Sequence, residues 1–176
     1  LESARQAVAS LKKGRRIEEL EQFALNDSMT GFYNRNAYDY FIYNEKNIKN
    51  YMVVTFDLNN LKMCNDNYGH SSGDAYIIHS AHIIETTFDR FGKCYRIGGD
   101  EFCCLIPDAA EFQIERFIQK MQQDIAILNN KNIIPTEVGI ACGYALATPD
   151  DADIEKVRER ADEMMYHNKK VLKGLI

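Results

Sequence analysis

The sequence predicts an α+β domain in which helices pack mainly on one face of an antiparallel-centred sheet. Three observations support this prediction. A continuous apolar run occupies residues 51–58 and ends in an acid. Two short apolar stretches, 94–97 and 101–106, are separated by a glycine pair, which is typical of a hairpin. Stripes of apolar residues at helical spacing alternate with these strands, in the order helix, strand, helix, hairpin, helix, strand, helix.

The first element is an amphipathic helix over residues 1–25. Apolar residues recur at helical spacing on both sides of a basic patch at 12–16. This imperfect heptad pattern predicts either one strand of a coiled coil or a helix that packs on its own domain. The chain begins at Leu1 rather than Met, so we expect it to be cut from a longer protein. Turn-forming residues then separate this helix from a domain over residues 26–176.

The next segment holds a helix and a continuous apolar run. Asn34 is the predicted cap of a helix that buries Ala37, Phe41 and Ile42. The run at 51–58 is rich in β-branched residues and has the length of a buried strand. We interpret the polar residues 59–74 as a loop with one helical turn.

Two further helices are predicted on either side of the hairpin. The first follows the polar loop, and its inward residues are Ile78, Ala81, Ile84, Phe88 and Phe91. The second spans 110–129, and its inward residues are Ile114, Phe117 or Ile118, Met121, Ile125 and Leu128. Both stripes have the spacing of one face of an α-helix.

The chain ends with a strand and a helix. In the strand over 137–147, four small residues would share one face and allow a helix or a ligand to approach closely: Gly139, Ala141, Gly143 and Ala145. The last helix spans 153–172, and its inward residues are Ile154, Val157, Ala161 and Met164 or Met165.

The composition is that of an ordinary globular chain. Hydrophobic residues make up 45% and charged residues 27% of the 176 residues, which indicates one domain with an appendage. The net charge of −5 argues against a nucleic-acid binder, but leaves room for an anionic small molecule held by a local basic site or a metal. No apolar run approaches the ~18 residues that span a bilayer. The five cysteines form no C-x-x-C pair, so we expect reduced thiols and no zinc site.

The turn between the hairpin strands carries the most informative chemistry. Gly98 and Gly99, with positive φ, would reverse the chain tightly, and the simplest interpretation is a turn with solvated acids. Asp57, however, ends a buried strand, where an unpaired acid is costly. If the strands are neighbours, Asp57, Asp100 and Glu101 meet at one rim and favour a cation such as Mg²⁺. The glycines would then let their backbone approach a phosphate closely.

Four separated blocks, in order, resemble the GGDEF domains, the diguanylate cyclases of bacterial signalling. Residues 27–35 (DSMTGFYNR) are similar to the opening block of the family, and residues 57–74 to its second block. Residues 96–102 (RIGGDEF) carry the signature itself, and residues 161–169 resemble the closing block. The resemblance covers the chain from about residue 24 onward.

The resemblance implies a palm-like fold of the nucleotidyl cyclase or ferredoxin-like type, preceded by an N-terminal signalling helix. It implies a homodimer in which two domains, each holding one GTP, condense them into cyclic di-GMP and release two pyrophosphates. The helix over 1–25 would join the domain to an upstream sensor on the same chain. We expect a cytoplasmic protein, or the cytoplasmic part of a membrane-bound sensor, with no nucleic-acid partner.

The resemblance also assigns roles to individual residues. Asp57 and Asp100, with the backbone carbonyl of Leu58, would bind Mg²⁺ or Mn²⁺. One of Asp100 and Glu101 would be the base for the 3′-hydroxyl, and Lys62 would stabilise charge in the transition state. The remaining residues would bind the substrate, at the guanine or at the phosphates: Asn65, His70, Asp74, Gly98, Gly99, Lys169 and Lys173.

Several alternatives remain open at this stage. Asp74 follows Ser71 by three residues and would also complete a helix capping box. Lys169 and Lys173 would also suit an ordinary surface, and His70 a turn. A catalytically silent module that binds GTP or cyclic di-GMP is the main alternative function, although such domains usually lose the signature acids. A cyclase of altered base choice is the third, and Asp74 argues against it because adenine leaves this acceptor unpaired.

Two departures from the family pattern bear on function. Asn59 stands where many members carry a second aspartate, which removes one negative charge near the metal. Many members also carry an R-x-x-D product-inhibition site before the glycine pair. Here that stretch is Asp89-Arg90-Phe91-Gly92, without the arginine or the aspartate in register. The sequence therefore predicts no feedback inhibition through that site.

Overall fold

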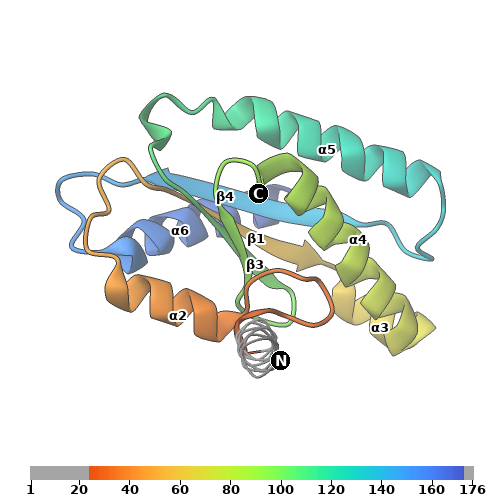
Figure 1. The fold of residues 1–176 in the computed structure, drawn as a ribbon. Helices are drawn as coiled ribbons and strands as arrows, with labels where there is room; N and C mark the ends of the chain where they lie inside the picture. The colour runs from red at the N-terminus through yellow and green to blue at the C-terminus, as the bar shows by residue number, and fades with distance from the viewer. Residues whose placement is uncertain (1–23, 173–176) are drawn as a thin grey trace, which may run out of the picture.

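The computed structural model describes residues 24–172, so the predicted helix over 1–25 lies almost entirely outside the described residues. Within this range one antiparallel sheet has the strand order β2-β3-β1-β4. Figure 1 shows the sheet at the centre of the molecule, flanked by helices. Its strands are β1 (Met52–Asn59), β2 (Lys93–Arg96), β3 (Glu101–Ile106) and β4 (Gly139–Leu146).

The connections make a βαββαβ unit. Helices α3 (Leu61–Tyr68) and α4 (His70–Phe88) link β1 to β2, and α5 (Ile114–Asn130) links β3 to β4 after a short 3-10 turn. Because β3 lies between β1 and β2, and β1 between β3 and β4, the two units interlock in the ferredoxin-like manner. The palm-like α+β fold predicted from the sequence is confirmed.

Helices cover both faces of the sheet, so the prediction of helices mainly on one face is wrong. One hydrophobic cluster joins Val54 and Phe56 of β1 to α3, α4 and α5. The other joins Val53 of β1 to α2 (Arg35–Asn44) and α6 (Ile154–Leu172), which lie outside the βαββαβ unit. All eight residues of β1 are buried, and a strand buried on both faces needs a layer on each.

Residues 59–74 are more helical than predicted. The eight-residue helix α3 occupies the middle of this stretch, and α4 already begins at His70. Buried Leu61 and Cys64 anchor α3 on the core, and Gly69, with φ of 83°, separates the two helices. The sequence analysis missed this helix because its composition is mostly polar and only one face of it packs on the core.

The buried stripe of α4 differs from the prediction at Ile78, and the predicted Phe91 packs on the core beyond the end of the helix at Phe88. Ile77, Ala81, Ile84 and Phe88 are buried, whereas Ile78 is 46% exposed. Ile77 keeps the i, i+4, i+7, i+11 spacing of one helical face, and Ile78 is turned about 100° away from it. The five cysteines are free and buried, as expected of core thiols.

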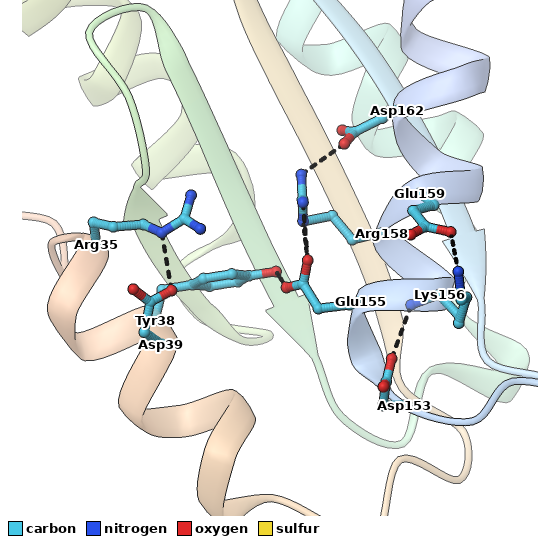
Figure 2. A network of polar contacts seen from close by, with 9 residues as sticks. All are labelled: Arg35, Tyr38, Asp39, Asp153, Glu155, Lys156, Arg158, Glu159 and Asp162. Carbon is cyan, nitrogen blue, oxygen red and sulfur yellow. Dashed lines mark hydrogen bonds and ion pairs between the residues drawn. The ribbon is translucent and has the colours of Figure 1, made fainter.

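Helix α2 begins as predicted, because the Asn34 side chain accepts a hydrogen bond from the Ala37 amide. A polar network then holds α2 to α6 (Figure 2). The fully buried Tyr38 hydroxyl donates to Glu155 at 3.0 Å, and Arg158 bridges Glu155 and Asp162 at 2.9 and 2.7 Å. Glu155 lies about four helical turns before Lys169, so this network anchors the half of α6 remote from the end of β1.

The small face of β4 brings α6 close to the sheet, as predicted. A Cβ at Gly143 would stand 2.2 Å from the Ala161 carbonyl oxygen and 2.3 Å from the Met165 amide nitrogen. Any side chain there forces α6 away from β4. At Gly139, in the same strand, the nearest atom to an added Cβ is 3.4 Å away, on Asn59.

We expect Gly143→Ala to destabilise the domain by about 3 kcal/mol, because overpacking against backbone cannot be relieved by a rotamer change. Chemical denaturation checks this value. Gly139→Ala is the matched control and should cost less than about 1 kcal/mol. Equal losses for the two variants would contradict the close approach of α6.

Candidate functional site

The first residue of the site is Asp57, a carboxylate near the end of the central strand β1. Asp57 is 9% exposed and lies opposite Glu101 of β3 and Ala141 of β4. Its Oδ1 atom accepts a 2.5 Å hydrogen bond from the Lys169 ammonium of α6. This ion pair offsets the burial of the Asp57 charge.

The β2–β3 turn places Asp100 beside the end of β1. The Leu58 amide donates to the Asp100 carbonyl at 3.0 Å, and the Ile97 and Gly98 amides both donate to the Glu101 carbonyl. The prediction of positive φ at the glycines is wrong, since only Gly31 and Gly69 have it among the described glycines. The turn is wider than a two-residue type I′ turn, so it needs no left-handed residue.

The two glycines serve different purposes in this turn. A Cβ at Gly98 would stand 2.8 Å from the Glu101 carboxylate, so a side chain there would displace the Glu101 side chain. A Cβ at Gly99 would meet nothing within 4 Å. The backbone of Gly99 is therefore open to an approaching group.

Arg96 and Asp27 hold the turn, a role that the sequence analysis missed. Arg96 donates from Nη2 to the Gly99 carbonyl at 2.8 Å and from Nη1 to Asp27 at 3.1 Å. Thr30 donates to the same Asp27 oxygen from its amide and its hydroxyl, at 2.9 and 2.7 Å. The signal was present, since Asp27 and Arg96 both belong to the quoted motif blocks.

The polar contacts of Asp27 outweigh the effect of its burial. Partial burial raises the pKa of Asp27, but the hydrogen bonds from Thr30 and Arg96 lower it below the ordinary value of 3.8. The carboxylate is therefore ionised at neutral pH and paired with Arg96, which orients the guanidinium toward Gly99.

A cleft of about 480 Å³ opens beside the turn. Four of the predicted site residues line it, from β1, α3, the turn and α6: Leu58, Lys62, Asp100 and Lys169. The other lining residues come mainly from α3. The structure thus brings four of the predicted site residues to one cleft, from the β1–α3 region, the β2–β3 turn and α6.

The predicted base-binding residues lie on α3 and α4. Asn65 is half-buried beside Gly73, where an added Cβ would stand 1.9 Å from Asn65 Oδ1. His70, the first residue of α4, and Asp74, in its second turn, are exposed. The capping box with Ser71 does not form, because the cap position is Gly69 and no side chain caps the helix. Lys173 lies outside the described residues.

The donor set fits a divalent cation that shares its ligands with a phosphate. No group of three or more His, Cys, Asp or Glu residues within 24–172 could hold a metal ion by itself. Asp57 and Asp100 offer two carboxylates at adjacent strand ends, with the Leu58 backbone between them. Mg²⁺ is commonly bound by one or two carboxylates together with substrate phosphates.

The comparisons with known proteins decide the family. The family model described as diguanylate cyclase, GGDEF domain, matches residues 24–173. The chain belongs to the GGDEF diguanylate cyclase family. The diguanylate cyclase DgcN of Escherichia coli is 31% identical over 157 residues, which are 86% of this chain. DgcS of Shewanella oneidensis is 27% identical over 161 residues, again 86% of this chain.

Solved GGDEF structures share the fold. The coiled coil and GGDEF domain of DgcB from Caulobacter crescentus, in complex with c-di-GMP, has a TM-score of 0.79 at 23% identity, covering 96% of this chain and 94% of that one. The diguanylate cyclase SiaD of Pseudomonas aeruginosa, in complex with its activator SiaC, has a TM-score of 0.72 at 21% identity, covering 97% and 68%.

The GGDEF chain spans 38% and 52% of the lengths of DgcN and DgcS. Within residues 24–172, no helix has the length and the apolar character needed to cross a membrane.

We expect Arg96→Gln to destabilise this GGDEF domain in a pH-dependent way. A carboxyl group whose folded pKa is lowered contributes stability above its unfolded pKa and loses it as pH falls through the folded value. The wild type should therefore have the higher free energy of unfolding, by an amount that is constant above about pH 4 and becomes smaller at lower pH. Urea denaturation of both proteins between about pH 3 and 7 measures this difference in the free energy of unfolding.

Arg35→Gln is the control for this experiment. It removes an exposed pair with Asp39, in which both side chains are more than half exposed. Such pairs contribute little, so we expect a change below about 0.5 kcal/mol. An Arg96→Gln effect that stays constant down to pH 3 would rule out the Asp27 pair as its source.

Proposed function

We propose that this chain is an active diguanylate cyclase, which condenses two GTP into cyclic di-GMP and two pyrophosphates as a Mg²⁺-dependent homodimer. The observation that supports this best is the cleft that gathers Asp100, Lys62, Lys169 and the Leu58 backbone beside Asp57. Within the GGDEF family, this combination suits a triphosphate and its counter-cation.

Asp57, Asp100 and the Leu58 carbonyl are the proposed holders of Mg²⁺ or Mn²⁺. A divalent cation bound there stabilises phosphate charge as a Lewis acid. Asn59 adds no charge to this set, but two carboxylates remain. Lys169 lines the cleft and already pairs with Asp57, and a triphosphate would give its ammonium a second anionic partner. Lys62, exposed on α3, lines the same cleft and would stabilise charge that develops on the phosphates.

Recognition of the guanine is proposed for Asn65 and Asp74, with His70 nearby. The exposed Asp74 carboxylate accepts two hydrogen bonds, as the guanine edge requires, and no capping role occupies it. Adenine would leave this acceptor unpaired, which favours GTP over ATP. Gly98 and Gly99 would lie along the phosphates, and Lys169 with Lys173 would hold their terminal end.

The reaction requires two domains. The 3′-hydroxyl of each GTP attacks the α-phosphorus of the other, the new P–O bond forms as the pyrophosphate leaves, and Asp100 or Glu101 accepts the hydroxyl proton. One domain holds only one of the two reacting groups in this scheme. Holding two domains face to face makes the reaction effectively unimolecular, which supplies much of the rate.

The setting of the domain is part of the proposal. The chain spans less than two thirds of the lengths of DgcN and DgcS, the solved DgcB structure includes a coiled coil, and SiaD was solved with its activator. We propose that residues 1–25 connect this domain to an upstream sensor and align two copies of it. The domain would then act in the cytoplasm, alone or as part of a membrane-bound sensor.

Incubation with GTP and Mg²⁺, with ATP in a parallel tube, tests the proposal by product mass. We expect cyclic di-GMP from GTP alone, with a loss of at least about 100-fold for Asp100→Ala because the variant lacks a metal ligand and a candidate base. Asp124→Ala is the control, since Asp124 pairs with Lys120 on α5. GTP binding without product would indicate the silent module, and an adenine-containing product an altered base choice.

Product should not inhibit this enzyme through an R-x-x-D site. A Cβ at Gly92 would stand 2.1 Å from the Leu105 carbonyl oxygen, so the position cannot take an aspartate without a backbone shift. The guanidinium of Arg90 instead lies 4.5 Å from the centre of the Phe91 ring. We expect calorimetric titration with cyclic di-GMP to give no tight binding outside the active site, in wild type and in Asp89→Arg alike. Tight product binding that excess GTP does not displace would contradict this.

A further inference from the structure

Tyr76 of α4 reaches the end of β1 from the opposite side to Lys169. It is fully buried, and its hydroxyl donates to the Asn59 carbonyl at 2.5 Å. The same hydroxyl accepts from the Gly139 amide at 2.7 Å. Asn59 and Gly139 are the last pair of the β1–β4 ladder, so the hydroxyl links the two strands where their pairing ends.

The hydroxyl is a permanent donor at neutral pH. Burial raises the pKa of Tyr76 to about 12, although the Gly139 backbone contact lowers it. The proton therefore stays on the hydroxyl, and the Asn59 carbonyl is its nearer acceptor, at 2.5 Å against 3.2 Å for the Gly139 carbonyl. Both backbone partners lie where the β1–β4 pairing ends. Losing the hydroxyl would leave the Asn59 carbonyl and the Gly139 amide without this hydrogen-bond partner.

The position of Tyr76 connects two halves of the proposed site. It is two residues after Asp74, on the helix that carries two of the proposed guanine-site residues, His70 and Asp74. Its partner Asn59 directly follows Asp57 and Leu58, the proposed metal-binding segment, whose other side is held by the 3.0 Å bond from the Leu58 amide to Asp100. One hydroxyl therefore fixes the helix that reads the base relative to the strand that holds the phosphates.

Resting on the proposed function, we propose that Tyr76 is a positioning residue of the cyclase, which sets the distance between the guanine-binding and metal-binding parts of the site. It touches neither substrate nor cation. Its removal should weaken the binding of a ligand that needs both parts at once, namely GTP together with Mg²⁺. Binding through the base alone should change less, because Asn65 of α3 packs against Gly73 of α4 and so keeps its place relative to Asp74.

Tyr76→Phe tests this proposal, because it removes the hydroxyl and keeps the ring. The probe is 3′-deoxy-GTP, which lacks the attacking hydroxyl, titrated calorimetrically with and without Mg²⁺. We expect Tyr76→Phe to weaken Mg²⁺-dependent binding about 5- to 10-fold, and Mg²⁺-free binding less than about 2-fold. Hydrogen exchange of the nucleotide-free protein should be faster at the Leu58 amide.

Tyr38→Phe is the matched control. Tyr38 is equally buried and loses one hydroxyl contact, to Glu155, at the remote half of α6. Tyr38→Phe should lower the melting temperature without changing the gain in 3′-deoxy-GTP affinity that Mg²⁺ provides. The positioning role would be overturned if both variants weakened binding equally, or if Tyr76→Phe bound like the wild type. A wild-type chain that binds no guanine nucleotide would overturn the proposed function itself.

Discussion

The structure depends on one costly feature, a carboxylate at the buried end of the central strand. Every residue of β1 is buried, and Asp57 is 9% exposed. Lys169 compensates for this burial across 112 residues of sequence, with a 2.5 Å contact. The pair is partly buried, with side chains 26% and 13% exposed, so losing Lys169 would leave the Asp57 charge without its partner, and α6 and β1 constrain each other's position. The close approach at Gly143 brings α6 near enough for this pair to form.

The remaining motif blocks support the turn that faces this strand. Arg96 ties the Gly99 carbonyl to Asp27, and Thr30 orients Asp27 in turn. Asp27, in the opening block of the family pattern, therefore supports the β2–β3 turn through an ion pair with Arg96. This pair is partly buried, with side chains 12% and 23% exposed. Pairs of this kind contribute more than surface pairs, because solvent screens them less. The residues before α2 thereby connect to the backbone that would face the phosphates.

The end of β1 pairs with β4 and is also held by the β2–β3 turn, α6 and α4. The amide of Leu58 bonds to the turn, Lys169 reaches Asp57, and the Tyr76 hydroxyl binds Asn59. The Oδ1 atom of Asn59 is buried and finds no hydrogen-bond partner among the described residues. An aspartate there would place a second charge in the same confined space. The neutral amide is therefore compatible with a strand end already stabilised by one ion pair.

The sequence by itself determined the α+β class, the strand order along the chain, the Asn34 cap and the small face of β4. These depend on local periodicity and on residue types with strong conformational preferences. The second layer of helices, the helix within residues 59–74 and the outward turn of Ile78 were decided only by tertiary structure. Polar helices gain their stability from packing, which local composition does not encode. The site divides in the same way. Motif spacing indicated Asp57, Asp100 and Lys169, whereas the bonds of Arg96 and Tyr76 exist only because the fold brings distant segments into hydrogen-bonding distance.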